Sequence, residues 1–315
     1  MKLIGKGRRK TEQINEEKKK AYYHLPGLFE FCGLYEKYLP LYFEHRDWFY
    51  EWCGIGSVYG APEDCIWGGG RTGYGDCDSA RVRKLFAEYG ISMRLTFSNM
   101  CIRKEHLGDR KCNALCEEFE NTGDVQNGII ITSDLLLDHI KEKYPGFYFV
   151  SSTTKVITDF GEFLRDMARP EYRYAVPDFR FNNRWDMLDG IPRSLRPKAE
   201  FLCNECCDIR CSDRKKCYEN VSLLALGTAG NGHVCRAPYG KEGYVFSRAM
   251  ESPAFISTED ITEKYLRNGF TEFKIEGRSL GSALILEILL HYMVKPEYRL
   301  RVRENIYLDA NLDLF

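Results

Sequence analysis

GIIITSDLLLDHIKEKYPGFYFVS, at residues Gly128–Ser151, contains the pattern that decides the fold of this chain. The apolar run Gly128–Thr132 has the length of a buried strand, and Phe147–Ser151 is a second run of the same kind. Between them, Ser133–Lys143 has helical spacing and begins with Ser-Asp, a common helix start. Two buried strands separated by a helix predict parallel strands joined by a crossover helix.

The same alternation recurs along the chain. Further apolar runs lie at Gly27–Phe31, Gly54–Tyr59, Met93–Phe97, Arg173–Val176, Glu200–Cys203 and Glu272–Ile275. Helical spacing is found at Leu34–Phe49, Ser79–Tyr89, Ala114–Phe119, Asp159–Met167 and Ile261–Asn268. A doubly wound open sheet also has alternating strands and helices, but this chain lacks the GxGxxG phosphate-binding fingerprint of that fold. The sequence therefore predicts a (β/α)8 TIM-like barrel, whose eight strands match the number of runs.

The length and composition of the chain fit a globular protein with a large core. The chain has 315 residues, of which 44% are hydrophobic and 29% are charged, and one large domain is as plausible as two. We expect a basic N-terminal segment at residues 1–20 and a barrel domain at residues 21–315. Within the barrel, residues 203–240 are expected to form a cysteine-rich insertion that binds a metal or cluster and caps the C-terminal rim.

Charge and hydropathy restrict the partners. The formal net charge is −1, and no run of eighteen apolar residues exists, so we expect a cytoplasmic protein with no membrane partner. The first twenty residues carry eight Lys and Arg against three Glu. Such a segment can contact phosphate groups of a nucleic acid, although a solvated terminus is the more frequent reason for it.

The cysteines are concentrated late in the chain. Six of the 13 lie between Cys203 and Cys235, and the odd total with no export signal favours reduced thiols. Thiolates at these spacings can reach one metal ion or iron–sulfur centre, because soft sulfur ligands favour such groups. Four of the cysteines, or three with His233, can also hold zinc. The spacing alone does not separate the two.

Polar residues follow several predicted strands. In a barrel of this type, function gathers at the C-terminal ends of the strands. Glu276 is a candidate acid or base, and Arg278 is a candidate for binding a carboxylate or phosphate group of a substrate. The alternative is that the two form a buried ion pair. Asn99, Asn204 and Glu205 follow other strands and are candidate substrate contacts.

Several blocks resemble the collagenase-like peptidase family (peptidase class U, number thirty-two). The segments Ser252–Asp260 and Phe273–Arg278, the latter reading FKIEGR, resemble the closing block of that family. Asn204–Arg214 resembles its cysteine-bearing segment, and Arg94–Asn99 resembles its third-strand end. The resemblance implies a barrel and, in several relatives, a 4Fe-4S cluster on four cysteines. Some relatives support oxygen-independent hydroxylation of a ubiquinone-ring precursor or of a base in tRNA or ribosomal RNA.

The resemblance also suggests a ligand set. Cys207 and Cys211 match the family segment, Cys217 is near enough to close the same loop, and Cys235 follows a glycine-rich return. Cys203 and Cys206 are the rivals. The spacing is compressed relative to longer members of the family, which leaves the ligation and the substrate open.

These observations lead to one leading hypothesis and two alternatives. The leading one is an iron–sulfur enzyme similar to the oxygen-independent hydroxylases, acting on an aromatic small molecule or an RNA base, alone or as a homo- or heterodimer. In it, Glu276 and Arg278 face the substrate, and Asn99, Asn204 and Glu205 line the mouth. The first alternative is a peptidase, although the chain has neither G-x-S-x-G nor H-E-x-x-H. The second is a non-catalytic, zinc-stapled barrel that binds RNA or a partner through its basic segment.

Overall fold

The fold is taken from a computed structural model, which describes residues 20–69, 75, 77–205, 207–236, 243–277 and 279–312. Most of the predicted basic segment, residues 1–19, lies outside the described residues. Residues 206 and 237–240 of the predicted cysteine-rich insertion also lie outside them.

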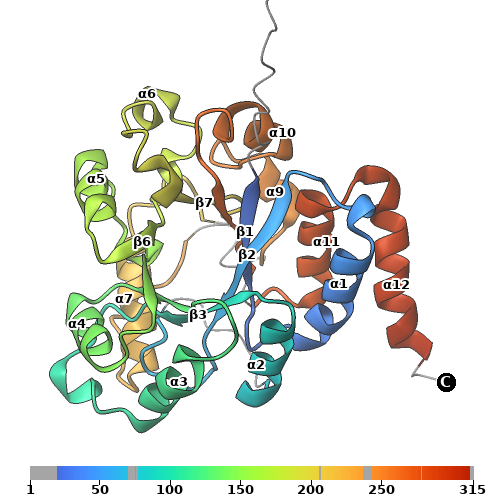
Figure 1. Cartoon of the computed structure of the whole chain (residues 1–315). Coiled ribbons are helices and arrows are strands. Elements are labelled where there is room, and N and C mark those ends of the chain that lie inside the picture. The colour runs from blue at the N-terminus through green and yellow to red at the C-terminus, as the bar shows by residue number, and fades with distance from the viewer. Residues whose placement is uncertain are drawn as a thin grey trace, which may run out of the picture.

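Eight parallel strands form the centre of the molecule (Figure 1). They are β1 Ala21–Pro26, β2 Cys53–Gly60, β3 Ser92–Phe97, β4 Gly128–Ile131, β5 Tyr148–Ser151, β6 Tyr172–Ala175, β7 Glu200–Leu202 and β8 Glu272–Lys274. Their order in the sheet is β6-β5-β4-β3-β2-β1-β8-β7. A parallel bridge between Ala175 of β6 and Ala199, just before β7, joins the two edges. The sheet is thus a nearly closed (β/α)8 barrel, which confirms the predicted fold class.

Helices surround the strands (Figure 1). They are α1 Cys32–Glu44, α2 Ser79–Glu88, α3 Arg110–Glu120, α4 Asp134–Lys143, α5 Phe160–Ala168, α6 Trp185–Leu188, α7 Arg214–Ala225, α9 Phe246–Met250, α10 Thr258–Asp260, α11 Ser282–Met293 and α12 Arg299–Leu312. A π-helical turn, Ile261–Tyr265, continues α10. In the described part of the chain, no helix combines the length and apolar character needed to cross a bilayer.

The predicted helix start at Ser133 is confirmed, and two other helices begin at polar caps of the same kind. The Asp78 side chain accepts hydrogen bonds from two backbone N–H groups of α2, and Ser133 caps α4 by accepting from the N–H of Leu136. Ser257 and Asp260 cap each other's backbone N–H at the start of α10. Each cap satisfies donors that the first helical turn leaves without an intrahelical acceptor.

The predicted first strand at Gly27–Phe31 is wrong, because β1 lies at Ala21–Pro26. Gly27 has φ +84°, and its carbonyl accepts hydrogen bonds from the N–H groups of Glu30 and Phe31, so the chain turns there. Phe29 and Phe31 are buried beneath this turn and at the start of α1. The apolar run therefore reflects burial at a turn rather than a strand.

The apolar core has two separate parts. The larger part lies between the strands and the surrounding helices. The smaller part fills the inside of the barrel with Tyr59, Ile130, Tyr148, Val150, Val176 and Leu202. Because successive side chains of a strand point to opposite faces, residues such as Lys274 and Glu272 of β8 project inward while Phe273 packs outward. The inward positions therefore also carry charge.

Candidate functional site

The middle of the barrel interior contains a network of buried charged groups. It is formed by His24, Arg94, Glu200, Glu272 and Lys274, each less than a tenth exposed. Arg94 Nη1 donates to Glu200 at 2.5 Å, and Lys274 Nζ donates to the other Glu200 oxygen at 3.5 Å. His24 Nε2 lies 3.0 Å from a Glu272 oxygen. Buried charges persist only when they are paired in this way, so the network is a structural element of the interior.

The network sets the charge state of its members. Burial alone raises the pKa of Glu200, but the positive charge of Arg94, followed by those of His24 and Lys274, lowers the pKa from 4.5 to about 2. Burial lowers the pKa of His24, and the charge of Arg94 adds to this effect. Glu200 is therefore ionised at neutral pH.

A cavity of about 40 Å³ lies above this network, at the C-terminal ends of the strands. Strands β2, β3, β4, β7 and β8, the residues that follow β5 and β6, and α7 all contribute to it. The lining residues are Tyr59, Thr96, Ser98, Ile130, Ser152, Thr153, Thr154, Val176, Leu202, Glu205, Tyr218, Lys274 and Glu276. This volume admits a few atoms, such as a carboxylate or an amide group, but not a whole ring. We refer to it as the mouth cavity.

Two donors lie at the floor of the mouth cavity. The Lys274 ammonium is 3.6 Å from the centre of the Tyr59 ring, a cation–π contact that holds it beside the opening. The Thr96 hydroxyl is buried and has no hydrogen-bond partner among the described residues. A buried hydroxyl without a partner is costly, and because Thr96 borders the cavity its hydroxyl can bond a polar group placed there.

Helix α7 covers one side of the mouth. Arg214 Nη2 donates to Glu205 at 2.6 Å and to the Tyr218 hydroxyl at 3.0 Å, and both partners line the cavity. Burial lowers the pKa of Arg214, but Glu205, then Tyr218, Cys207 and Asp178, outweigh it and raise the pKa well above its usual value. Arg214 Nε and Nη1 have no hydrogen-bond partner among the described residues. The guanidinium is therefore a fixed positive charge behind the cavity wall.

The predicted residues Glu205 and Glu276 both line the mouth cavity. Glu205 also accepts a hydrogen bond from the Cys207 N–H at 3.0 Å. The other predicted catalytic residue, Arg278, lies outside the described residues. The structure thus brings two carboxylates and one lysine together at the opening.

Asn99 and Asn204 are buried and connect segments of backbone. The Asn204 amide exchanges two hydrogen bonds with the backbone of Glu276, at 2.8 and 3.0 Å. The Asn99 amide donates to the carbonyls of Ile66 and of Ser222 on α7. Neither residue lines the mouth cavity. Both hold the rim together, and substrate contact by either stays a prediction.

The four predicted cluster ligands occupy different surroundings. Cys207 and Cys211 are half-buried in the connection after β7, Cys217 lies in α7, and Cys235 is exposed. Among the described residues, no group of three or more His, Cys, Asp or Glu side chains is arranged to hold a metal ion. Cys206, one of the rivals, is not among them. The described geometry therefore does not fit a cluster or zinc ion as it stands, and the ligand set stays a prediction.

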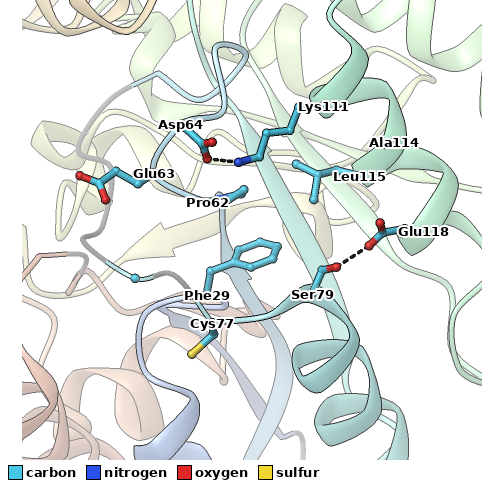
Figure 2. Close-up of a pocket in the computed structure, with 11 residues that line it drawn as sticks. Phe29, Pro62, Glu63, Asp64, Cys77, Ser79, Lys111, Ala114, Leu115 and Glu118 are labelled. Carbon is cyan, nitrogen blue, oxygen red and sulfur yellow. Dashed lines mark hydrogen bonds and ion pairs between the residues drawn. The ribbon is translucent and has the colours of Figure 1, made fainter.

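A second, larger cavity of about 580 Å³ lies outside the barrel interior (Figure 2). It is bounded by the connection after β2, which carries Glu63 and Asp64, and by α2 and α3. Asp64 pairs with Lys111 of α3, and the Ser79 hydroxyl donates to Glu118 at 2.5 Å (Figure 2). Asp64 and Lys111 therefore satisfy each other within its wall, and Glu118 is held by Ser79.

Three residues of the mouth cavity were not predicted as site residues, namely Thr96, Lys274 and Tyr218. Lys274 alternates with Glu272 and Glu276, and a period of two along a strand places all three on one face. That pattern was the available signal, because charged residues are seldom buried on the inner face of a barrel strand unless they are paired or bind a ligand. Tyr218 gave no comparable signal, because its position depends on how α7 crosses the mouth.

No protein-family model matches the chain, and no curated protein matches it. A solved structure that is similar is known as "The Structure of the U32 Peptidase Mk0906". It shares 12% sequence identity with this chain over 89% of this chain and 98% of that one, with a TM-score of 0.47. That structure is named for the peptidase family that the sequence blocks resemble. A similarity of this extent does not show a shared function.

Proposed function

We propose that the protein is an enzyme that binds an acceptor oxygen of its substrate, from a carboxylate, an amide or another carbonyl, in the mouth cavity. The observation that carries this proposal is the Thr96 hydroxyl, which lines the cavity and has no hydrogen-bond partner among the described residues. The adjacent Lys274 supplies a positive charge. A hydroxyl and an ammonium group at one opening suit an oxygen that carries negative charge or develops it during a reaction.

The carboxylates at the rim suit acid–base chemistry. Glu276 lines the same cavity as Lys274, so a group bound at the floor has a carboxylate beside it. In hydrolysis of an amide, Glu276 takes a proton from the attacking water and returns it to the leaving nitrogen, while Lys274 and Thr96 stabilise the oxygen. This is the form that the peptidase alternative takes here. Glu205 is held by Arg214 and positions the wall of the cavity.

The second candidate is the iron–sulfur-dependent hydroxylation of an aromatic ring or an RNA base. The observation that favours it is the contact between Cys207 and Glu205, which joins the cysteine-rich segment to the wall of the mouth cavity. A centre held by Cys207 would adjoin the wall of the cavity that Glu205 forms, and the ring of such a substrate would lie outside the cavity, which admits only a few atoms. A cluster would supply one-electron or Lewis-acid chemistry, and Arg214 would offset part of its negative charge. No step of the first candidate depends on it.

The test compares the products formed by anaerobically purified protein. Short peptides, an aromatic carboxylate and a nucleoside monophosphate are incubated with it, and the products are identified by mass spectrometry. The first candidate predicts new peptide termini, and the second predicts a gain of oxygen on the ring or base. Iron and sulfide are measured on the same sample, and about four irons per chain accompany the second outcome.

Two matched variants connect the activity to the site. Glu276→Gln removes the rim carboxylate, and Glu118→Gln changes a carboxylate of the second cavity. We expect Glu276→Gln to lower kcat/KM by about 10²-fold or more while Glu118→Gln keeps it. Equal activity of the two variants, or loss in Glu118→Gln alone, would place the reaction elsewhere and overturn the proposal.

A further inference from the structure

Two cysteines far apart in the sequence meet at the edge of the second cavity. Cys65 follows β2, Cys112 lies in the first turn of α3, and their sulfur atoms are 3.2 Å apart across a sequence separation of 47 residues. Both side chains are buried, at 2% and 0% exposure. Neither belongs to the cysteine-rich segment after β7. The inference drawn from them is independent of the proposed function.

The residues that precede the two cysteines are also paired. Asp64 forms an ion pair with Lys111, and both line the second cavity (Figure 2). Two consecutive residues of the connection therefore contact two consecutive residues of α3. The two contacts share one register, in which the Cys65 and Cys112 sulfurs face each other.

The thiols are protected in the reduced state. The hydrogen bond with Cys65, followed by burial, raises the pKa of the Cys112 thiol. Burial, followed by contact with Cys77, raises the pKa of the Cys32 thiol in the same region. Because the thiolate is the reactive form, these groups exchange slowly and need local opening. When the segment opens and Cys65 reacts, Cys112 is the neighbouring thiol that can complete the exchange.

We propose that Cys65 and Cys112 form a reversible dithiol–disulfide pair that fixes the wall of the second cavity. With a small disulfide RSSR as oxidant, the Cys65 thiolate attacks one sulfur and releases RS⁻, leaving a mixed disulfide. The Cys112 thiolate then attacks the Cys65 sulfur and releases the second RS⁻. The two protein thiols lose two electrons and two protons, and RSSR is reduced to two RSH.

The cross-link has a structural consequence. It joins the connection after β2 to α3 covalently and holds Asp64 against Lys111. Closing a loop across 47 residues of sequence separation restricts the unfolded chain, so the oxidised protein is expected to melt about 5 °C higher than the reduced one.

The test uses the full chain and oxidised glutathione as the probe. The protein is incubated over a range of oxidised-to-reduced glutathione ratios for about a day, so that rare openings suffice. Free thiols are then blocked, and the unreduced digest is examined by mass spectrometry. We expect a peptide pair joined through Cys65 and Cys112, lighter by two hydrogens. The variant Cys112→Ser should stop at the first step and retain one glutathione on Cys65.

Cys116 supplies the matched control, because it is buried on α3 one turn after Cys112. Cys116→Ser should keep the cross-link and the rise in Tm, whereas Cys65→Ser and Cys112→Ser lose both. The proposal is overturned if Cys65 and Cys112 carry the blocking reagent at every glutathione ratio. It is also overturned if the cross-link disappears in Cys116→Ser, because Cys65 then pairs with a different sulfur.

Discussion

The middle of the barrel and its mouth both contain buried polar groups, but the two regions treat them differently. In the middle, each of the ionisable residues His24, Arg94, Glu200, Glu272 and Lys274 has a partner within the network. At the mouth, the Thr96 hydroxyl has no hydrogen-bond partner among the described residues. A satisfied network stabilises the fold, whereas an unsatisfied donor at a cavity lowers stability. The middle therefore serves structure, and we propose that the mouth, which shares Lys274 with it, binds a ligand.

The largest expected effect comes from removing the central charge of the network. Glu200→Gln leaves Arg94 and Lys274 without their buried counter-charge, and we expect a loss of about 3–5 kcal/mol in the free energy of unfolding. Urea denaturation measures this loss. Glu276→Gln at the mouth is the control, with an expected change within about 1 kcal/mol. Similar losses in both variants would erase the difference between the two regions.

The pH dependence of stability sharpens the same contrast. The pKa of Glu200 is lowered from 4.5 to about 2 in the folded protein, so its contribution is present above pH 4.5 and is lost as the pH falls toward 2. That shift corresponds to about 3 kcal/mol. The measurement is the free energy of unfolding between pH 7 and 2, compared between the native protein and Glu200→Gln. Parallel curves for the two proteins would show that Glu200 is not the group responsible.

A smaller effect on stability, with a large effect on activity, is expected for Lys274→Arg. The longer guanidinium keeps a positive charge near Glu200 but displaces it from the face of the Tyr59 ring. We expect activity to fall by about 10²-fold, because the group that stabilises the substrate oxygen is misplaced. Lys111→Arg, at the second cavity, should leave kcat/KM unchanged. Loss of activity in Lys111→Arg with none in Lys274→Arg would place the reaction at the second cavity and contradict the proposal.

Tyr218→Phe should have the smallest effect of the single changes. It removes the hydroxyl that accepts from Arg214 at 3.0 Å while keeping the ring that lines the mouth. We expect a loss of about 1 kcal/mol, typical of one hydrogen bond, measured by urea denaturation. A loss of several kcal/mol would mean that α7 is held over the mouth mainly through this group.

The alternation of strands and helices was predictable because a barrel strand is buried on both faces, and its apolar run is visible in the sequence. Gly128–Ile131 and Tyr148–Ser151 show this directly. The first strand was misplaced because Phe29 and Phe31 are buried at a turn, and burial alone does not distinguish a turn from a strand.

The candidate site was predictable only in part. Glu205 and Glu276 follow strands whose ends meet at the rim, so their positions follow from the fold. Thr96 and Tyr218 could not be found, because a missing hydrogen-bond partner and a crossing helix are properties of the packed structure. The contact between Cys65 and Cys112 was equally hidden, since 47 residues of sequence separation gave no reason to pair them.

The most direct test compares two threonines that line the same cavity, Thr96 and Thr154. The Thr154 hydroxyl lies 2.5 Å from Thr132 Oγ1 and 2.9 Å from Ser152 Oγ, whereas Thr96 has no hydrogen-bond partner among the described residues. The measurement is the free energy of unfolding of Thr96→Val and Thr154→Val in urea. We predict that Thr96→Val is as stable as the native protein or more stable by about 1 kcal/mol, while Thr154→Val loses about 1–3 kcal/mol. A loss in Thr96→Val equal to that in Thr154→Val would show that the Thr96 hydroxyl serves the fold, and would contradict the assignment of the mouth as the ligand site.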